Sequence, residues 1–83
     1  MEVKEIKYDG STDHGQFKKG TSLRHGRCVA IFNDGRIDDG FFKEDKFHGP
    51  RLYIYPSGNY RIEQWENGNW MSVKEFRADG TPN

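Results

Sequence analysis

The hydrophobic positions of this chain follow the two-residue period of β-strands. Short aromatic and β-branched runs, such as CVAIF and LYIY, are separated by turn sequences such as NDG, PSG and ADG. No segment sustains the 3.6-residue period of an amphipathic helix, although a short helix competes with a strand over residues 69–78. The pattern predicts an all-β protein, built as a single antiparallel sheet of about six or seven strands in consecutive hairpins.

A repeat underlies this alternation. Four glycines, spaced 25, 23 and 22 residues apart, close successive copies of the pattern: Gly10, Gly35, Gly58 and Gly80. Seven residues after each of the first three stands a large aromatic side chain: Phe17, Phe42 and Trp65. We therefore expect one domain, residues 1–83, with repeat units at about 10–34, 35–57 and 58–80. A single hairpin cannot bury its own face, so each unit is expected to pack against the next.

The repeated unit reads Gly-x-aromatic-x-x-Gly, then His-Gly, then Tyr-x-Tyr-x-x-Gly. Its best copy is DDGFFKED with EDKFHGPRLYIYPSG, its second is GQFKKGTSLRHGRCVAIFNDG, and the degenerate third, YRIEQWENGNWMSVKEFRADG, has Met71-Ser72 in place of His-Gly. Over residues 8–80 the chain resembles the MORN (membrane occupation and recognition nexus) repeat family. The resemblance implies a sheet of hairpins and a scaffold role in cytoskeletal, ciliary or membrane-associated assemblies.

Two positions depart from the family pattern. The tyrosine expected three residues after the closing glycine is replaced by a charged residue in every unit: Asp13, Asp38 and Arg61. The second glycine, expected two residues after His-Gly, is Cys28 in the first unit and Arg51 in the second.

Side-chain parity assigns the residues to two faces. The aromatic residues Phe17, Phe42 and Trp65 share a face with Gly15, Gly40 and Glu63, and return-strand residues of equivalent parity close the same face: Ala30, Phe32, Tyr53 and Tyr55. We expect an aromatic ladder in which rings fill the gaps left by glycine, and closing glycines that adopt positive φ in turns.

The opposite parity is also partly apolar, whereas antiparallel sheets usually have one polar face. Either the sheet curls over this second face or a partner covers it. We expect a protein partner or a second copy to bind there. The predicted partner-binding residues are Val29, Ile31, Phe41, Leu52, Ile54, Tyr60 and Ile62.

Charge narrows the classes of partner. Thirteen basic and thirteen acidic residues give a net charge of zero, which argues against nucleic-acid binding. A local basic segment offers an alternative function, binding of phosphoinositide or anionic lipid headgroups through Lys18, Lys19, Arg24 and Arg27. The neighbouring acidic segment 34–45 opposes such binding, so any membrane attraction is expected to be weak. A further alternative is a small accessory subunit of a large complex.

No residue pattern indicates catalysis, a metal site or a cofactor. Cys28 is the only cysteine, so no internal disulfide forms, and it is expected to be a buried structural residue. His25 and His48 occupy equivalent repeat positions, which favours a role in packing the turns over metal binding. We therefore expect a non-enzymatic cytoplasmic protein, associated with the cytoskeleton or a membrane if the MORN resemblance extends to function.

Overall fold

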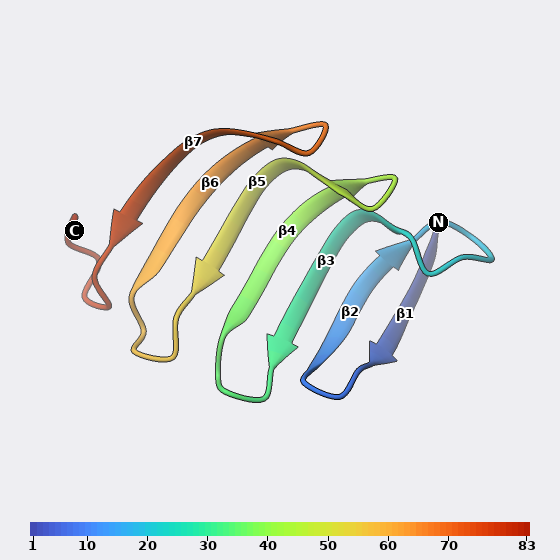
Figure 1. The fold of residues 1–83 in the computed structure, drawn as a ribbon, viewed down its shortest axis with the longest axis horizontal. Coiled ribbons are helices and arrows are strands. Elements are labelled where there is room, and N and C mark those ends of the chain that lie inside the picture. The colour runs from blue at the N-terminus through green and yellow to red at the C-terminus, as the bar shows by residue number, and fades with distance from the viewer.

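The computed structural model describes all 83 residues and contains seven strands in one antiparallel sheet (Figure 1). Each strand pairs with its neighbours in sequence, so the spatial order is the chain order. The strands are β1 (Glu2–Lys7), β2 (Ser11–Phe17), β3 (Arg24–Phe32), β4 (Ile37–Lys43), β5 (Lys46–Ile54), β6 (Tyr60–Glu66) and β7 (Asn69–Phe76). The predicted all-β sheet of hairpins is confirmed.

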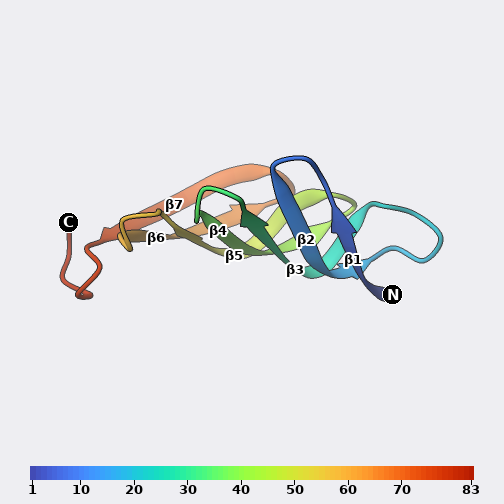
Figure 2. The same ribbon diagram turned by 90° about the horizontal axis from the view of Figure 1, so that it is seen from below.

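The sheet forms one twisted layer, and no other element covers either face (Figure 2). Its principal extents are 41 × 27 × 16 Å. β1 and β7 are the two open edges. The helix considered for residues 69–78 is wrong: β7 pairs with β6 along its length, from Glu66–Asn69 to Tyr60–Phe76. The backbone N–H and C=O groups on the outer side of β6 need hydrogen-bond partners. Pairing with β7 supplies these partners, and this gain outweighs the weak helical pattern of residues 69–78.

The two faces predicted from parity are present. In register, residues of one face follow one another across the strands, as in the row Ile6–Asp13–Ala30–Asp38–Tyr53–Arg61. We call this side, which also carries Phe17, Phe42 and Trp65, the ladder face, and the other side the second face. All six buried residues belong to the ladder face: Asp13, Phe17, Cys28, Gly40, Phe42 and Glu63. The small core therefore lies on this side of the sheet.

The aromatic ladder runs along β4, β5 and β6. The ring centroids of Phe42 and Phe47 are 4.6 Å apart, and those of Phe47 and Trp65 are 5.1 Å apart. A β-carbon at Gly40 would come within 3.5 Å of the Phe47 ring, so this glycine provides the expected gap. At Gly15 the expectation of a ring is wrong. A β-carbon there would lie 2.3 Å from the Arg27 carbonyl oxygen, because the backbone of β3 approaches closely beside a bulge.

Three of the four closing glycines have the predicted positive φ: Gly35 at 98°, Gly58 at 93° and Gly80 at 89°. The prediction is wrong for Gly10, which has no positive φ. Gly10 instead supplies a carbonyl oxygen that accepts the backbone N–H of Asn33 at 2.9 Å, joining two neighbouring turns. This turn can therefore form without the left-handed conformation that favours glycine.

The two histidines join successive hairpins. The Nδ1 atom of His25 accepts the backbone N–H of Glu44 at 3.2 Å, and Nδ1 of His48 accepts that of Asn67 at 3.0 Å. Both donors are turn residues with positive φ, 51° and 49°, whose N–H groups have no strand partner. The predicted turn-packing role is confirmed, and it explains why the His-Gly pair recurs in the first two units.

Candidate functional site

The seven residues predicted to bind a partner all lie on the second face, on the four central strands β3 to β6. Two rows of the register contain most of them. One row is Ile31–Ile37–Ile54–Tyr60, and the next is Val29–Asp39–Leu52–Ile62. Folding thus gathers side chains that are up to 33 positions apart in sequence onto one largely apolar surface, which Asp39 interrupts in the second row.

Exposure divides these seven residues into two groups. Three are open to solvent: Ile31 is 45% exposed, Phe41 43% and Ile62 41%. The other four, Val29, Leu52, Ile54 and Tyr60, are half-buried by their neighbours. Tyr60 is partly covered because its ring stacks on Phe76 of β7, with centroids 5.1 Å apart.

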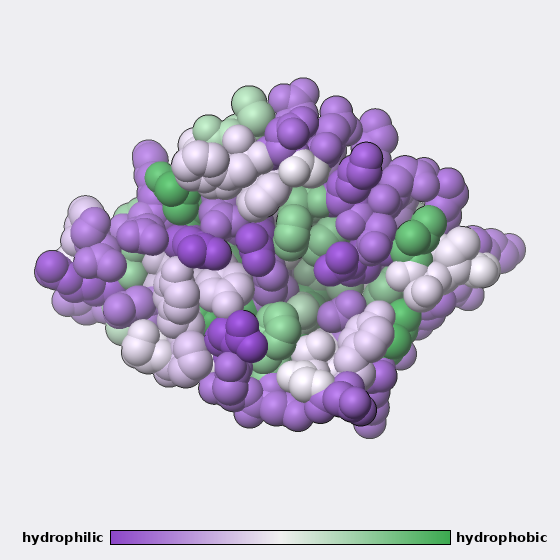
Figure 3. All heavy atoms as spheres, viewed as in Figure 1, coloured by the Kyte–Doolittle hydropathy of each residue, from purple (hydrophilic) through white to green (hydrophobic).

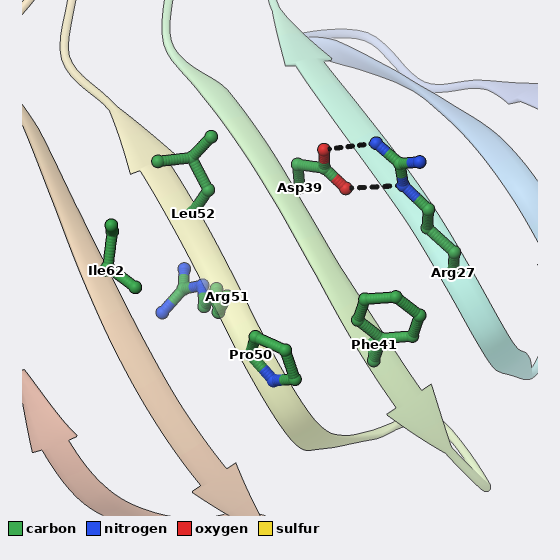
Figure 4. A pocket seen from close by; sticks show the side chains of 7 residues that line it. All are labelled: Arg27, Asp39, Phe41, Pro50, Arg51, Leu52 and Ile62. Carbon is green, nitrogen blue, oxygen red and sulfur yellow. Dashed lines mark hydrogen bonds and ion pairs between the residues drawn. The ribbon is translucent and has the colours of Figure 1, made fainter.

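The centre of this surface is hollow (Figure 4). Phe41, Pro50, Leu52 and Ile62 surround a depression of about 260 Å³, while the side chain of Arg51 points to the other side of the sheet. Parity with Leu52 would have placed Pro50 on this face. Proline lacks a backbone N–H and is uncommon inside a central strand, and Pro50 is not among the partner-binding residues predicted from the sequence.

An ion pair borders the depression. The guanidinium of Arg27 donates two hydrogen bonds to the carboxylate of Asp39, at 3.1 and 2.7 Å. The hydrogen bonds that Arg27 donates to Asp39, together with the negative charge of Asp39, raise the pKa of Arg27. The two charges neutralise each other. The Arg27–Asp39 pair therefore adds polar groups at the edge of the depression but no net charge that would attract a charged ligand.

The ladder face has a different chemistry. Figure 3, which shows the molecule from the same side as Figure 1, displays hydrophilic residues interleaved with small hydrophobic patches. Arg51 lies at the centre of the ladder face and binds two acids, the half-buried Asp38 and the buried Glu63. It donates to both oxygens of Asp38, at 2.8 and 2.5 Å, and to Glu63 at 2.9 Å. Burial lowers the pKa of Arg51, but the hydrogen bonds and charges of these two acids outweigh it and raise the pKa overall.

Arginine and aromatic side chains alternate through this network. The Arg51 guanidinium lies 4.2 Å from the Phe47 ring centroid, within the range of a cation–π contact. Arg61 donates to the Tyr55 hydroxyl at 2.9 Å, and its Nε lies 2.7 Å from Glu63 without the alignment of a hydrogen bond. The charged residues that depart from the MORN pattern in the second and third units therefore form one half-buried polar network.

The four basic residues of the lipid alternative are not gathered into one patch. Lys18 pairs with Glu44 at 2.7 Å, Arg24 with Asp45 at 2.7 Å and Arg27 with Asp39. The remaining one, Lys19, is exposed. Arg24 extends over the Phe42 ring on the ladder face, whereas Arg27 belongs to the second face. Most of their charge is matched by neighbouring acids.

Cys28 is 2% exposed and packs with Phe17 and Phe42, as expected of a structural cysteine. Burial, with a smaller contribution from the charge of Asp13, raises the pKa of this thiol to about 11, so it is protonated at neutral pH. The structure brings together no group of three or more histidine, cysteine or acidic residues able to hold a metal ion. It also contains no long apolar helix of the kind that crosses a bilayer.

Comparisons of the chain with models of protein families and with curated proteins give no match. The single antiparallel sheet of hairpins defines the fold class. The resemblance to MORN repeats stays a prediction from the quoted motifs.

Proposed function

We propose that this protein is a non-catalytic protein-interaction module that binds a partner on the second face of its sheet. The observation that carries the proposal is the largely apolar surface across β3 to β6, which no element of the chain covers. Three of its large side chains are more than 40% exposed. Exposed apolar patches of this kind commonly mark interaction sites.

The shape of the surface favours one kind of partner. A second copy would present the same hollow, and two hollows facing each other leave their centres unfilled. The depression instead fits a convex ridge, such as the apolar side of an amphipathic helix with residues at i, i+3 or i+4, and i+7. The neutral Arg27–Asp39 pair at the border suits a ridge that carries no strong net charge.

The expected affinity is modest. A large apolar side chain contributes about 1.5–3 kcal/mol when it is fully buried, so covering the exposed parts of Ile31, Phe41 and Ile62 supplies about 2–4 kcal/mol. A micromolar complex requires about 8 kcal/mol, and the partner's own side chains must supply the rest. The proposed interaction is therefore transient. Membership of a cytoskeletal or membrane-associated scaffold, which the MORN resemblance implies, is part of the same proposal.

Peptide display against the 83-residue chain, followed by NMR titration of a selected peptide, tests the proposal. We expect amphipathic sequences whose binding perturbs Phe41, Leu52 and Ile62. The Phe41→Asp/Ile62→Asp variant should abolish this binding and keep its β-sheet circular dichroism spectrum. The matched control is Val3→Asp, which changes a 78% exposed residue of the same face on the edge strand β1 and should bind normally.

Three results would overturn the proposal. Binding that maps to the ladder face would show that the interaction surface lies on the opposite side of the sheet. Light scattering that reports a dimer broken by the double variant would identify the occupant as a second copy. Unfolding of the double variant, together with loss of binding in Val3→Asp, would show that the second face has no specific role in recognition.

A further inference from the structure

A separate hollow lies on the ladder face, where the first repeat unit meets the second. It has a volume of about 430 Å³ and is bounded by β2, β3, β4 and the adjoining turns. Ala30 forms its floor, standing in register between Asp13 and Asp38. Leu23 and Phe32 contribute apolar wall. Sites for small ligands and single side chains have comparable volumes, about 300–1,000 Å³.

Asp13 is the one carboxylate of this hollow without a partner. The other two acids that line it are engaged, Asp38 by Arg51 and Asp45 by Arg24 at 2.7 Å. Asp13 is only 7% exposed, yet it forms no hydrogen bond and no ion pair within the chain. Burial raises its pKa, and the charge of Arg24 opposes that rise. The Asp13 oxygens are not among the fully buried unpaired atoms of the chain, so they open into the hollow, where a ligand can reach them.

The second repeat unit shows what the first lacks. Asp13 and Asp38 are equivalent, each three residues after a closing glycine. In the second unit, Arg51 binds Asp38 with two hydrogen bonds and rests on the Phe47 ring. The position that corresponds to Arg51 in the first unit is Cys28.

A ring is missing from the first unit as well. The residue in register with Asp38 is Tyr53, whereas the residue in register with Asp13 is Ala30. The first unit therefore keeps the carboxylate but lacks the arginine and the tyrosine that stand at the equivalent positions of the second unit. The small side chain of Ala30, which lines the hollow, leaves it open.

We propose that this hollow binds an organic cation, a guanidinium or ammonium group from another molecule, held by Asp13 as Arg51 is held by Asp38. An arginine side chain is the preferred ligand, because its planar fork matches a carboxylate with two hydrogen bonds. A metal ion is disfavoured because Asp13 is the only acid here that is not already bound by an arginine. This site is on the opposite face from the proposed docking surface and is independent of it.

NMR titration of the ¹⁵N-labelled chain tests the proposal. The probes are the blocked tripeptide acetyl-Gly-Arg-Gly-amide, its citrulline analogue, which has the same shape without the charge, and methylguanidinium. We expect the arginine peptide and methylguanidinium to perturb the amides of residues 11–13, 23–24 and 30, and the citrulline peptide not to. Tighter binding of the peptide than of methylguanidinium would indicate a protein ligand, and equal binding a free cation.

Two variants identify the site. Asp13→Asn should weaken the arginine peptide about 10- to 100-fold, since it removes a charge-assisted pair of hydrogen bonds. Glu66→Gln, which removes one exposed acid at the far end of β6, should leave binding unchanged. Ala30→Tyr keeps Asp13 and restores the ring found in the second unit, so it should also block binding.

The proposal is overturned if the citrulline peptide binds as well as the arginine peptide, or if Asp13→Asn binds normally. It is also overturned if the perturbed amides map to the second face. Because the two surfaces lie on opposite sides of the sheet, failure here leaves the proposed docking surface untouched.

Discussion

Arg51 is expected to be the most sensitive polar residue of the chain. Its guanidinium is the shared partner of two acids, Asp38 and Glu63, whose side chains are 12% and 5% exposed. Arg51→Met keeps the apolar stem and removes the charge. Glu63 retains contacts with Arg61 and with Trp65, whose Nε1 donates to it at 2.7 Å. Asp38 keeps no partner.

The expected loss of stability in Arg51→Met comes from Asp38, which is left without a partner while Glu63 keeps two. Leaving a buried charge without its partner destabilises proteins by about 3–5 kcal/mol. At about 0.05–0.15 kcal/mol per residue, a chain of this length has a total stability of about 4–12 kcal/mol. Arg51→Met should therefore remove about a quarter or more of the stability and leave part of the population unfolded. Adding Asp38→Asn removes the stranded charge and should recover a substantial part of the loss.

Urea unfolding followed by circular dichroism measures these differences. The matched control is Arg36→Met, because Arg36 pairs with Asp34 in an exposed turn and surface ion pairs contribute about 0–1 kcal/mol. A loss below about 1 kcal/mol in Arg51→Met, similar to the control, would refute the reasoning. So would a double variant with Asp38→Asn that is no more stable than Arg51→Met alone.

Three further predictions concern Cys28, His48 and Asp13. Cys28, with its pKa near 11 and 2% exposure, should react with iodoacetamide at least about 100-fold more slowly than a free cysteine, and a rate equal to that of the unfolded chain would contradict its burial. His48→Ala should cost about 1 kcal/mol in urea unfolding by depriving the Asn67 N–H of its acceptor, whereas the exposed His14→Ala should cost little. Because the folded-state pKa of Asp13 is raised, ionisation destabilises the native state as pH rises above 3.8, so Asp13→Asn should be more stable than the natural chain at pH 7 and equally stable well below pH 3.8. Greater stability of the natural chain at pH 7 would show that Asp13 has an internal partner.

The number of hairpins, their phase and the residues of each face were predictable from the sequence. Phe17, Phe42 and Trp65 recur seven residues after a glycine, and strand geometry sends alternate side chains to opposite faces. The histidine positions were equally readable, because His25 and His48 repeat in step with the hairpins. These features depend on local backbone geometry and on a periodic pattern, both of which are written along the chain.

Other features depended on contacts across strands. Residues 69–78 form a strand because β6 offers an unpaired backbone, and Gly15 contacts backbone rather than a ring because of a bulge. Asp13 and Asp38 are equivalent in sequence, but Asp38 finds Arg51 across the sheet whereas Asp13 faces Ala30 and Cys28. Whether a charged residue is paired or free is set by the neighbouring strand's register, and a single strand's sequence does not contain that information.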